Sequence, residues 1–166
     1  MAMHMKHTSA PLARYLAIAY ALLVAYASLH PLTGWRDNGV PVFDYLGAAW
    51  PRYYTGFDLA ANILAYLPLG FLLVPALQMR LGVAAAALIA ALAGGGLGFV
   101  LETLQNFLPS RVPSNIDLAC NAIGAMIGAA AGMNWGRALT DGGHLHRLRT
   151  RLVVDGPAAD FGLVLR

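Results

Sequence analysis

Four long apolar segments constrain this chain more than any other feature of its sequence. They cover residues 12–29, 59–77, 81–101 and 118–135. Each approaches the length, roughly 17 to 25 residues, that a helix needs to cross a bilayer. Internal prolines, which break soluble helices, are tolerated in membrane helices because neighbouring groups satisfy the freed carbonyls. The sequence therefore predicts an all-α membrane protein whose core is a four-helix transmembrane bundle.

The composition agrees with this class of protein. Hydrophobic residues make up 58% of the chain and charged residues only 11%, whereas soluble domains carry about 25% charged residues. The net charge is +3, but the basic residues lie outside the apolar segments and form no stripe with aromatic residues. We therefore expect membrane lipid as a partner and no nucleic acid. The single cysteine, Cys120, excludes a disulfide or a CxxC zinc site within one chain.

Orientation follows from the lysine and arginine residues that flank the segments. One side holds seven of them: Lys6, Arg14, Arg80, Arg137, Arg147, Arg149 and Arg151. The other side holds three: Arg36, Arg52 and Arg111. This asymmetry predicts a multi-pass protein of a bacterial inner membrane with both termini in the cytoplasm, and with the loops at 30–57 and 102–116 outside.

The predicted organisation is an N-terminal segment at 1–11, a transmembrane domain at 12–136 and a basic cytoplasmic tail at 137–166. The tail becomes apolar again near its end, so it is either an interfacial segment or the start of a further helix. The first apolar segment also resembles a cleavable signal peptide, with Ala25-Tyr26-Ala27 as the small-residue site. Its removal would leave an odd number of spans, so we expect it to be retained.

Two predicted helix starts share a pattern. Asp58-Leu59-Ala60-Ala61-Asn62 and Asp117-Leu118-Ala119-Cys120-Asn121 each place a carboxylate four residues before an amide. A carboxylate at a helix start can cap free N–H groups and suits the helix dipole. Both helices would descend from the same membrane surface. We therefore predict a bundle of two similar helical hairpins, a kind of repeat that occurs in transporters.

Most polar residues of the predicted bundle fall at one end of it. In an antiparallel arrangement, the first and third helices end where the second and fourth begin. The polar residues at these ends are Ser28, His30, Asp58, Asn62, Glu102, Gln105, Arg111, Ser114, Asp117 and Asn121. Small-residue stripes lead toward them, at Gly124, Gly128 and Gly132 and at Gly94, Gly95 and Gly98. Such stripes allow close helix packing, so we expect the carboxylates to turn inward, toward one another.

This set of residues permits several kinds of chemistry. Glu102 lies at a helix C-terminus, where the dipole opposes negative charge, and Arg111 is its expected partner. Arg111 beside helix N-termini suits a phosphate group. Asp58, Glu102 and Asp117 have the oxygen ligands of a divalent cation, although no cofactor is predicted. Glu102 or His30 can act as acid or base, but no nucleophile motif is present. A purely structural hydrogen-bond network explains the same residues.

The same positions carry a resemblance to a known family. The motifs are Asp58-x3-Asn62-x3-Tyr66-x-Pro68-x-Gly70-Phe71, then Glu102-x2-Gln105, Arg111, Ser114 and Asp117-Leu118-x2-Asn121-x2-Gly124-x3-Gly128. Over about residues 15–135 the chain resembles the VanZ-like family of bacterial membrane proteins. The resemblance implies a multi-helix inner-membrane protein. The founding member is associated with low-level resistance to teicoplanin, a lipid-anchored glycopeptide antibiotic.

Three functions fit these observations. The first is a non-enzymatic membrane factor that binds a lipid or a cell-envelope ligand at the extracytoplasmic polar site. The second is an enzyme that acts on a lipid-linked or phosphorylated envelope substrate. The third is a small transporter, which would need to form a homo-oligomer because four helices enclose little room. We expect the first, and we expect that the protein is not an enzyme.

Overall fold

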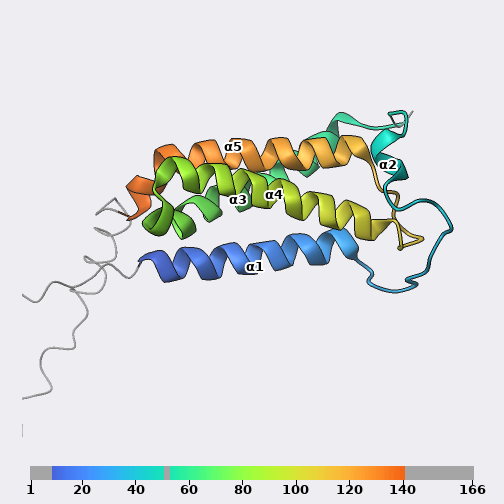
Figure 1. Ribbon diagram of the computed structural model, residues 1–166, viewed down its shortest axis with the longest axis horizontal. Coiled ribbons are helices and arrows are strands. Elements are labelled where there is room, and N and C mark those ends of the chain that lie inside the picture. Colours follow the sequence, from blue (N-terminus) through green and yellow to red (C-terminus); the bar gives the residue numbers. More distant parts are fainter. Residues whose placement is uncertain (1–8, 51–52, 141–166) are drawn as a thin grey trace, which may run out of the picture.

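The computed structural model describes residues 9–50 and 53–140 (Figure 1). Its elements are α1 Ser9–Leu29, α2 Asp44–Gly47, α3 Gly56–Leu81, α4 Val83–Gln105 and α5 Asn115–Thr140. No strand occurs among these residues. The helices α1, α3, α4 and α5 are long and apolar enough to cross a membrane. The predicted all-α membrane fold is therefore confirmed.

Most helix ends lie a few residues beyond the predicted bounds, whereas α1 ends at the predicted Leu29 and α4 begins at Val83, two residues after the predicted start. The helix α3 starts before Leu59 because Thr55 forms a capping box with Asp58. The Asp58 N–H donates to Thr55 Oγ1 at 3.1 Å, and the Thr55 N–H donates to Asp58 Oδ2 at 2.9 Å. Gly82, with φ +78°, is the single residue between α3 and α4. Glycine adopts this conformation without steric cost, so two antiparallel helices meet at one residue.

The ends of the chain extend past this description. The predicted N-terminal segment 1–11 lies outside the described residues apart from 9–11, which begin α1. The predicted tail 137–166 also lies outside them, apart from residues 137–140, which continue α5. The short helix α2 was not predicted, because four residues are too few to show a helical period.

The helices α3, α4 and α5 pack against one another as the core of the bundle, with α3 and α5 in the most extensive contact. Glycine makes this contact possible. A Cβ atom at Gly124 or Gly128 would collide with the carbonyl of Ile63 or Leu67 on α3. At Gly132 it would lie 2.9 Å from the Phe71 oxygen. The predicted close packing along this stripe is confirmed.

The helix α4 also packs closely against α5, and glycines of α4 lie at this contact. A Cβ atom at Gly98 would lie 3.1 Å from the Cβ of Asn121, and one at Gly94 would crowd the side chain of Ala125. This packing brings the C-terminal half of α4, with Glu102, beside the N-terminal half of α5. Cys120 of α5 is buried, as expected of a small residue in the core.

The helix α1 lies at the edge of the bundle, against α3 and to a lesser extent α4 (Figure 1). Its buried side chains, within the part of the chain that the structure describes, are only Ala17, Val24 and Leu29. Hydrogen bonds to α3 supplement this sparse packing. Arg14 Nε donates to the Ala76 carbonyl at 3.2 Å, and the Tyr20 hydroxyl donates to the Ala65 carbonyl at 3.1 Å.

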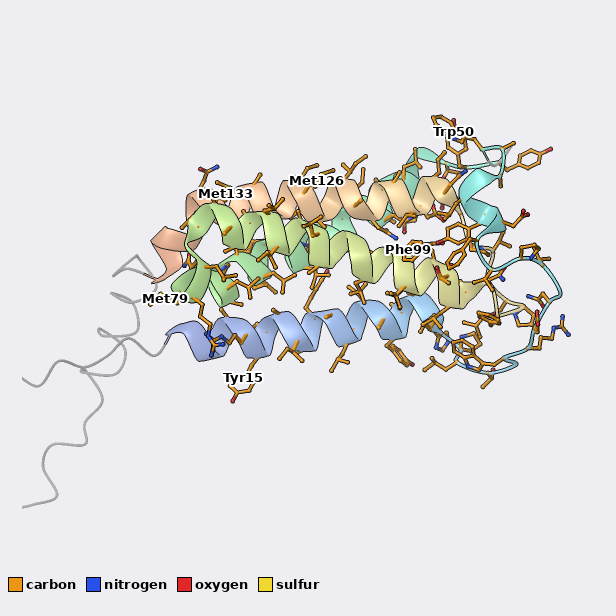
Figure 2. All side chains as sticks on the ribbon, viewed as in Figure 1. Tyr15, Trp50, Met79, Phe99, Met126 and Met133 are labelled. Carbon is orange, nitrogen blue, oxygen red and sulfur yellow. The ribbon has the colours of Figure 1, made fainter. Side chains whose placement is uncertain are left out.

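The two ends of the bundle differ in their chemistry. We call the end where α1 and α4 finish and α3 and α5 begin the polar end. Figure 2 shows side-chain oxygen and nitrogen atoms gathered there, with Trp50 at the same end and Met79 and Met133 at the opposite one. These helix ends therefore lie together, as the sequence predicts. The equivalence of two hairpins stays a prediction, because α3 packs on α5 and α4 as well as on α1.

Candidate functional site

A cavity of about 670 Å³ lies at the polar end, between α1 and the α3–α4–α5 core. Its walls come from all four long helices and from the loop between α4 and α5. Its polar lining consists of Tyr20, Ser28, Asn62, Tyr66, Glu102, Gln105, Ser110, Arg111, Asp117 and Asn121. Its apolar lining consists of Leu23, Val24 and Ala27 of α1, Ala61 and Ala65 of α3, and Val112. The cavity therefore has both polar and apolar walls.

Glu102 is the more deeply buried of the two acidic side chains in the cavity, with 4% of its surface exposed. Its Oε2 accepts the backbone N–H of Ser114 at 3.0 Å. Arg111, the expected partner of Glu102, interacts with it through charge, but the hydrogen bond of Glu102 goes to Ser114, because the loop after α4 carries Ser114 back over Glu102 and carries Arg111 to α1. A buried backbone N–H therefore takes the place of the expected guanidinium.

Arg111 binds the C-terminal end of α1 instead. Its Nε donates to the His30 carbonyl at 3.1 Å, and its Nη2 donates to the Ala27 carbonyl at 3.0 Å. The last carbonyls of a helix lack partners within it and carry partial negative charge, so a guanidinium suits them. Gln105 reinforces this attachment, because its Nε2 donates to the Ser28 carbonyl at 3.2 Å and to Ser28 Oγ at 2.8 Å.

A second polar contact joins α3 to α5. Asn62 Nδ2 donates to Asp117 Oδ1 at 2.8 Å. The backbone N–H of Asp117 in turn donates to Ser114 Oγ at 3.4 Å. Ser114, just before α5, therefore takes the capping role that the sequence assigned to Asp117, and the carboxylate is directed to the neighbouring helix.

Asn121 is the least satisfied polar residue of the cavity. It is 3% exposed, and within the described residues its Oδ1 is buried without a hydrogen-bond partner. Leaving such an atom unpaired costs about 1–3 kcal/mol. The side chains of Asn121 and Tyr66 both lie close to Gly98 of α4. Asn121 lines the cavity, but its Oδ1 is covered by neighbouring atoms, so the amide has to rotate before a ligand in the cavity can bond to this oxygen.

Two predicted site residues do not line the cavity. Asp58 is exposed and is held by Thr55, to which its Oδ2 is bonded by both the backbone N–H and the hydroxyl. The expectation that all three carboxylates turn inward is thus wrong for Asp58, because Thr55 competes for it. His30 is also exposed, with its ring edge-on to Tyr26, and only its carbonyl contributes to the site.

The remaining predicted residues stand close to the cavity. Its lining includes Asn62, Glu102, Gln105, Arg111, Asp117 and Asn121, and Ser114 contacts two of them. Tyr66, which is 4% exposed and also lines the cavity, was not predicted as a site residue. Its position four residues after Asn62 would have identified it, because that spacing places both side chains on one helix face.

The geometry bears on the divalent cation considered for the three carboxylates. With Asp58 held in its cap, only Glu102 and Asp117 remain in the cavity. In the part of the chain described by the structure, no three His, Cys, Asp or Glu side chains gather at one point. The three carboxylates considered as ligands from the sequence are therefore not brought together in this structure.

Comparison with known proteins gives one match. The family model described as VanZ/LLP1 matches residues 8–135. The match spans every residue that lines the cavity. No curated protein and no solved structure shows significant similarity to the chain.

Proposed function

Because the chain belongs to the VanZ/LLP1 family, we propose that it is a membrane factor whose polar-end cavity binds the headgroup of a lipid or of a lipid-linked envelope ligand. The observation that carries this proposal is the two-sided character of the cavity. Glu102, Asn62 and Asn121 offer hydrogen bonds, whereas Leu23 and Ala61 offer apolar surface. A lipid headgroup with its first acyl carbons has the same two-sided chemistry.

The mouth of the cavity supports entry from the bilayer. Residues that line the cavity and are also exposed mark its opening, and they include Leu23 at 57% and Val112 at 84% exposure. Ala61, on α3, also lines the cavity and is exposed. Leu23 lies six residues before the end of α1, which is about 9 Å along a helix. In the proposed arrangement, the opening runs from the membrane surface into the depth of the acyl chains.

The side of the membrane enters the proposal through the flanking charges. The excess of lysine and arginine beside the opposite end of the bundle favours a cytoplasmic location for that end. The cavity then faces the outer leaflet of the inner membrane, where lipid-linked envelope precursors and glycopeptides that carry acyl chains are exposed. The proposed function therefore includes a role in the response of the cell envelope to such antibiotics.

A matched pair of variants tests ligand binding. Ala61→Phe places a ring at the mouth of the cavity, whereas Ala60→Phe places the same ring on an exposed position of α3 outside the lining. Gentle extraction followed by native mass spectrometry should find lipid bound to the wild type and to Ala60→Phe. We expect Ala61→Phe to retain roughly tenfold less, since a filled cavity loses the buried contacts of the ligand. Equal retention by the two variants would contradict the proposal.

A further inference from the structure

We infer that the cavity selects headgroups that carry a protonated primary amine, an inference that rests on the proposed function because it concerns the same site. Unpaired acceptors in the cavity carry the argument. Within the described residues, Asn121 Oδ1 has no donor and is buried. One oxygen of Glu102 accepts from Ser114, and one oxygen of Asp117 accepts from Asn62. Among residues 9–50 and 53–140, no donor bonds to the second oxygen of either carboxylate.

These acceptors define the chemistry of a complementary group. An alkylammonium group has three N–H donors and no acceptor. Glu102 and Asp117 each have one carboxylate oxygen without a donor among the described residues, and Asn121 Oδ1 is a further unpaired acceptor, so the N–H groups of an ammonium find acceptors here, two of them on acidic side chains. A hydroxyl group brings one donor and adds lone pairs, and a quaternary ammonium group brings no donor. A primary amine is therefore the headgroup that satisfies this lining best.

The charges of the lining point in the same direction. Its acidic side chains are Glu102 and Asp117, and its basic side chain is Arg111. Arg111 directs its Nε and Nη2 at the carbonyls of His30 and Ala27, which leaves less of the guanidinium for an anion. Buried carboxylates are costly unless a cation pairs with them. The lining is thus more complementary to a cationic group than to an isolated phosphate.

A methylation series of lipids with identical acyl chains tests the inference. Wild-type protein in mixed bilayer nanodiscs would be offered phosphatidylethanolamine, its N-methyl and N,N-dimethyl forms, phosphatidylcholine and phosphatidylglycerol. We expect bound lipid, measured by native mass spectrometry, to fall stepwise with the number of N–H donors. Phosphatidylethanolamine should exceed phosphatidylcholine roughly tenfold, since hydrogen bonds to charged groups are the strong ones. Equal binding of these two, or a preference for phosphatidylglycerol, would overturn the inference.

Charge-removing variants connect the preference to the site. Glu102→Gln and Asp117→Asn keep an oxygen for the Ser114 N–H and for Asn62, yet each removes one negative charge. Both should bring the ratio of bound phosphatidylethanolamine to phosphatidylcholine close to one. Asp44→Asn removes a charge from α2, outside the lining, and should leave the ratio as in the wild type. An unchanged ratio in both cavity variants would refute the assignment.

The same experiment separates failure of this inference from failure of the proposed function. If lipid binds and Ala61→Phe removes it without any amine preference, then the cavity binds lipid and only the inference fails. Soluble ethanolamine provides the other arm, because it carries the ammonium group without acyl chains. If ethanolamine binds and Glu102→Gln abolishes its binding while no lipid is retained, then the amine selectivity holds and the proposed lipid function fails.

Discussion

Replacing Gly128 with leucine is expected to separate α3 from α5 and to destabilise the bundle more than any other single change considered. A side chain at this position would meet the backbone of Leu67 and Phe71, and backbone within a helix cannot move aside as a flexible side chain can. Inserting atoms into a packed core typically costs about 1–3 kcal/mol, and here we expect the upper end or more. Unfolding of the purified protein by denaturing detergent, followed by circular dichroism, would measure the loss.

Gly96→Leu is the matched control for this experiment. Gly96 lies within α4, and a Cβ there would meet no atom within 4 Å. The same leucine at this exposed position should leave stability unchanged or raise it slightly, because glycine is a poor helix former by about 1 kcal/mol. Comparable losses for Gly96→Leu and Gly128→Leu would show that the glycine contact between α3 and α5 does not hold the bundle together.

The second large effect is expected at Arg111. Its removal by Arg111→Ala takes away the two hydrogen bonds that bind the Ala27 and His30 carbonyls. Hydrogen bonds to charged groups contribute about 1.5–3 kcal/mol each when well formed. We therefore expect the last turn of α1 to open more often, while the α3–α5 contact remains. Hydrogen–deuterium exchange should rise roughly tenfold or more in this turn and stay unchanged in α5.

Two further variants define what Arg111 contributes. Arg111→Lys keeps the charge but loses the planar fork that reaches two carbonyls at once, so its exchange should fall between wild type and Arg111→Ala. Arg36→Ala removes an exposed arginine of the first loop, whose side chain bonds to Asn38 rather than to α1. It should leave α1 protected. If the exchange of α1 in Arg111→Ala equals that of the wild type, then contacts other than those of Arg111 hold α1 in place.

The sequence predicts the fold well because few structures are available to such a chain. In lipid, every backbone N–H and C=O group must be hydrogen-bonded within the protein. Four apolar segments of membrane-spanning length meet this requirement as helices. The glycine stripe at 124–132 was also informative, because a four-residue spacing of small residues places them on one helix face. The polar end follows from the alternation of helix direction alone. Each of these properties depends on spacing along a single helix.

The contacts within the site depend on the path of the loops, and here prediction stops. Proximity in sequence favoured Arg111 as the partner of Glu102, yet the loop directs it to α1 and offers the Ser114 N–H instead. Asp58 and Asp117 share a pattern, but Thr55 precedes one and holds its carboxylate, whereas Asn62 receives the other. Competing partners from different helices decide these cases, and a sequence pattern does not rank such competitors.

The attachment of α1 also bears on how far its sequence can vary. The hydrogen bonds that attach α1 share one kind of acceptor, a main-chain carbonyl. The pairs are Arg14 with Ala76, Tyr20 with Ala65, Gln105 with Ser28, and Arg111 with Ala27 and His30. Every residue type supplies that acceptor, so substitutions at the accepting positions leave these bonds possible. The lining that Leu23 and Ala27 give the cavity can therefore change in size while α1 stays attached. Under the proposed function, such changes would alter the fit of the cavity to an acyl chain while the polar site stays the same.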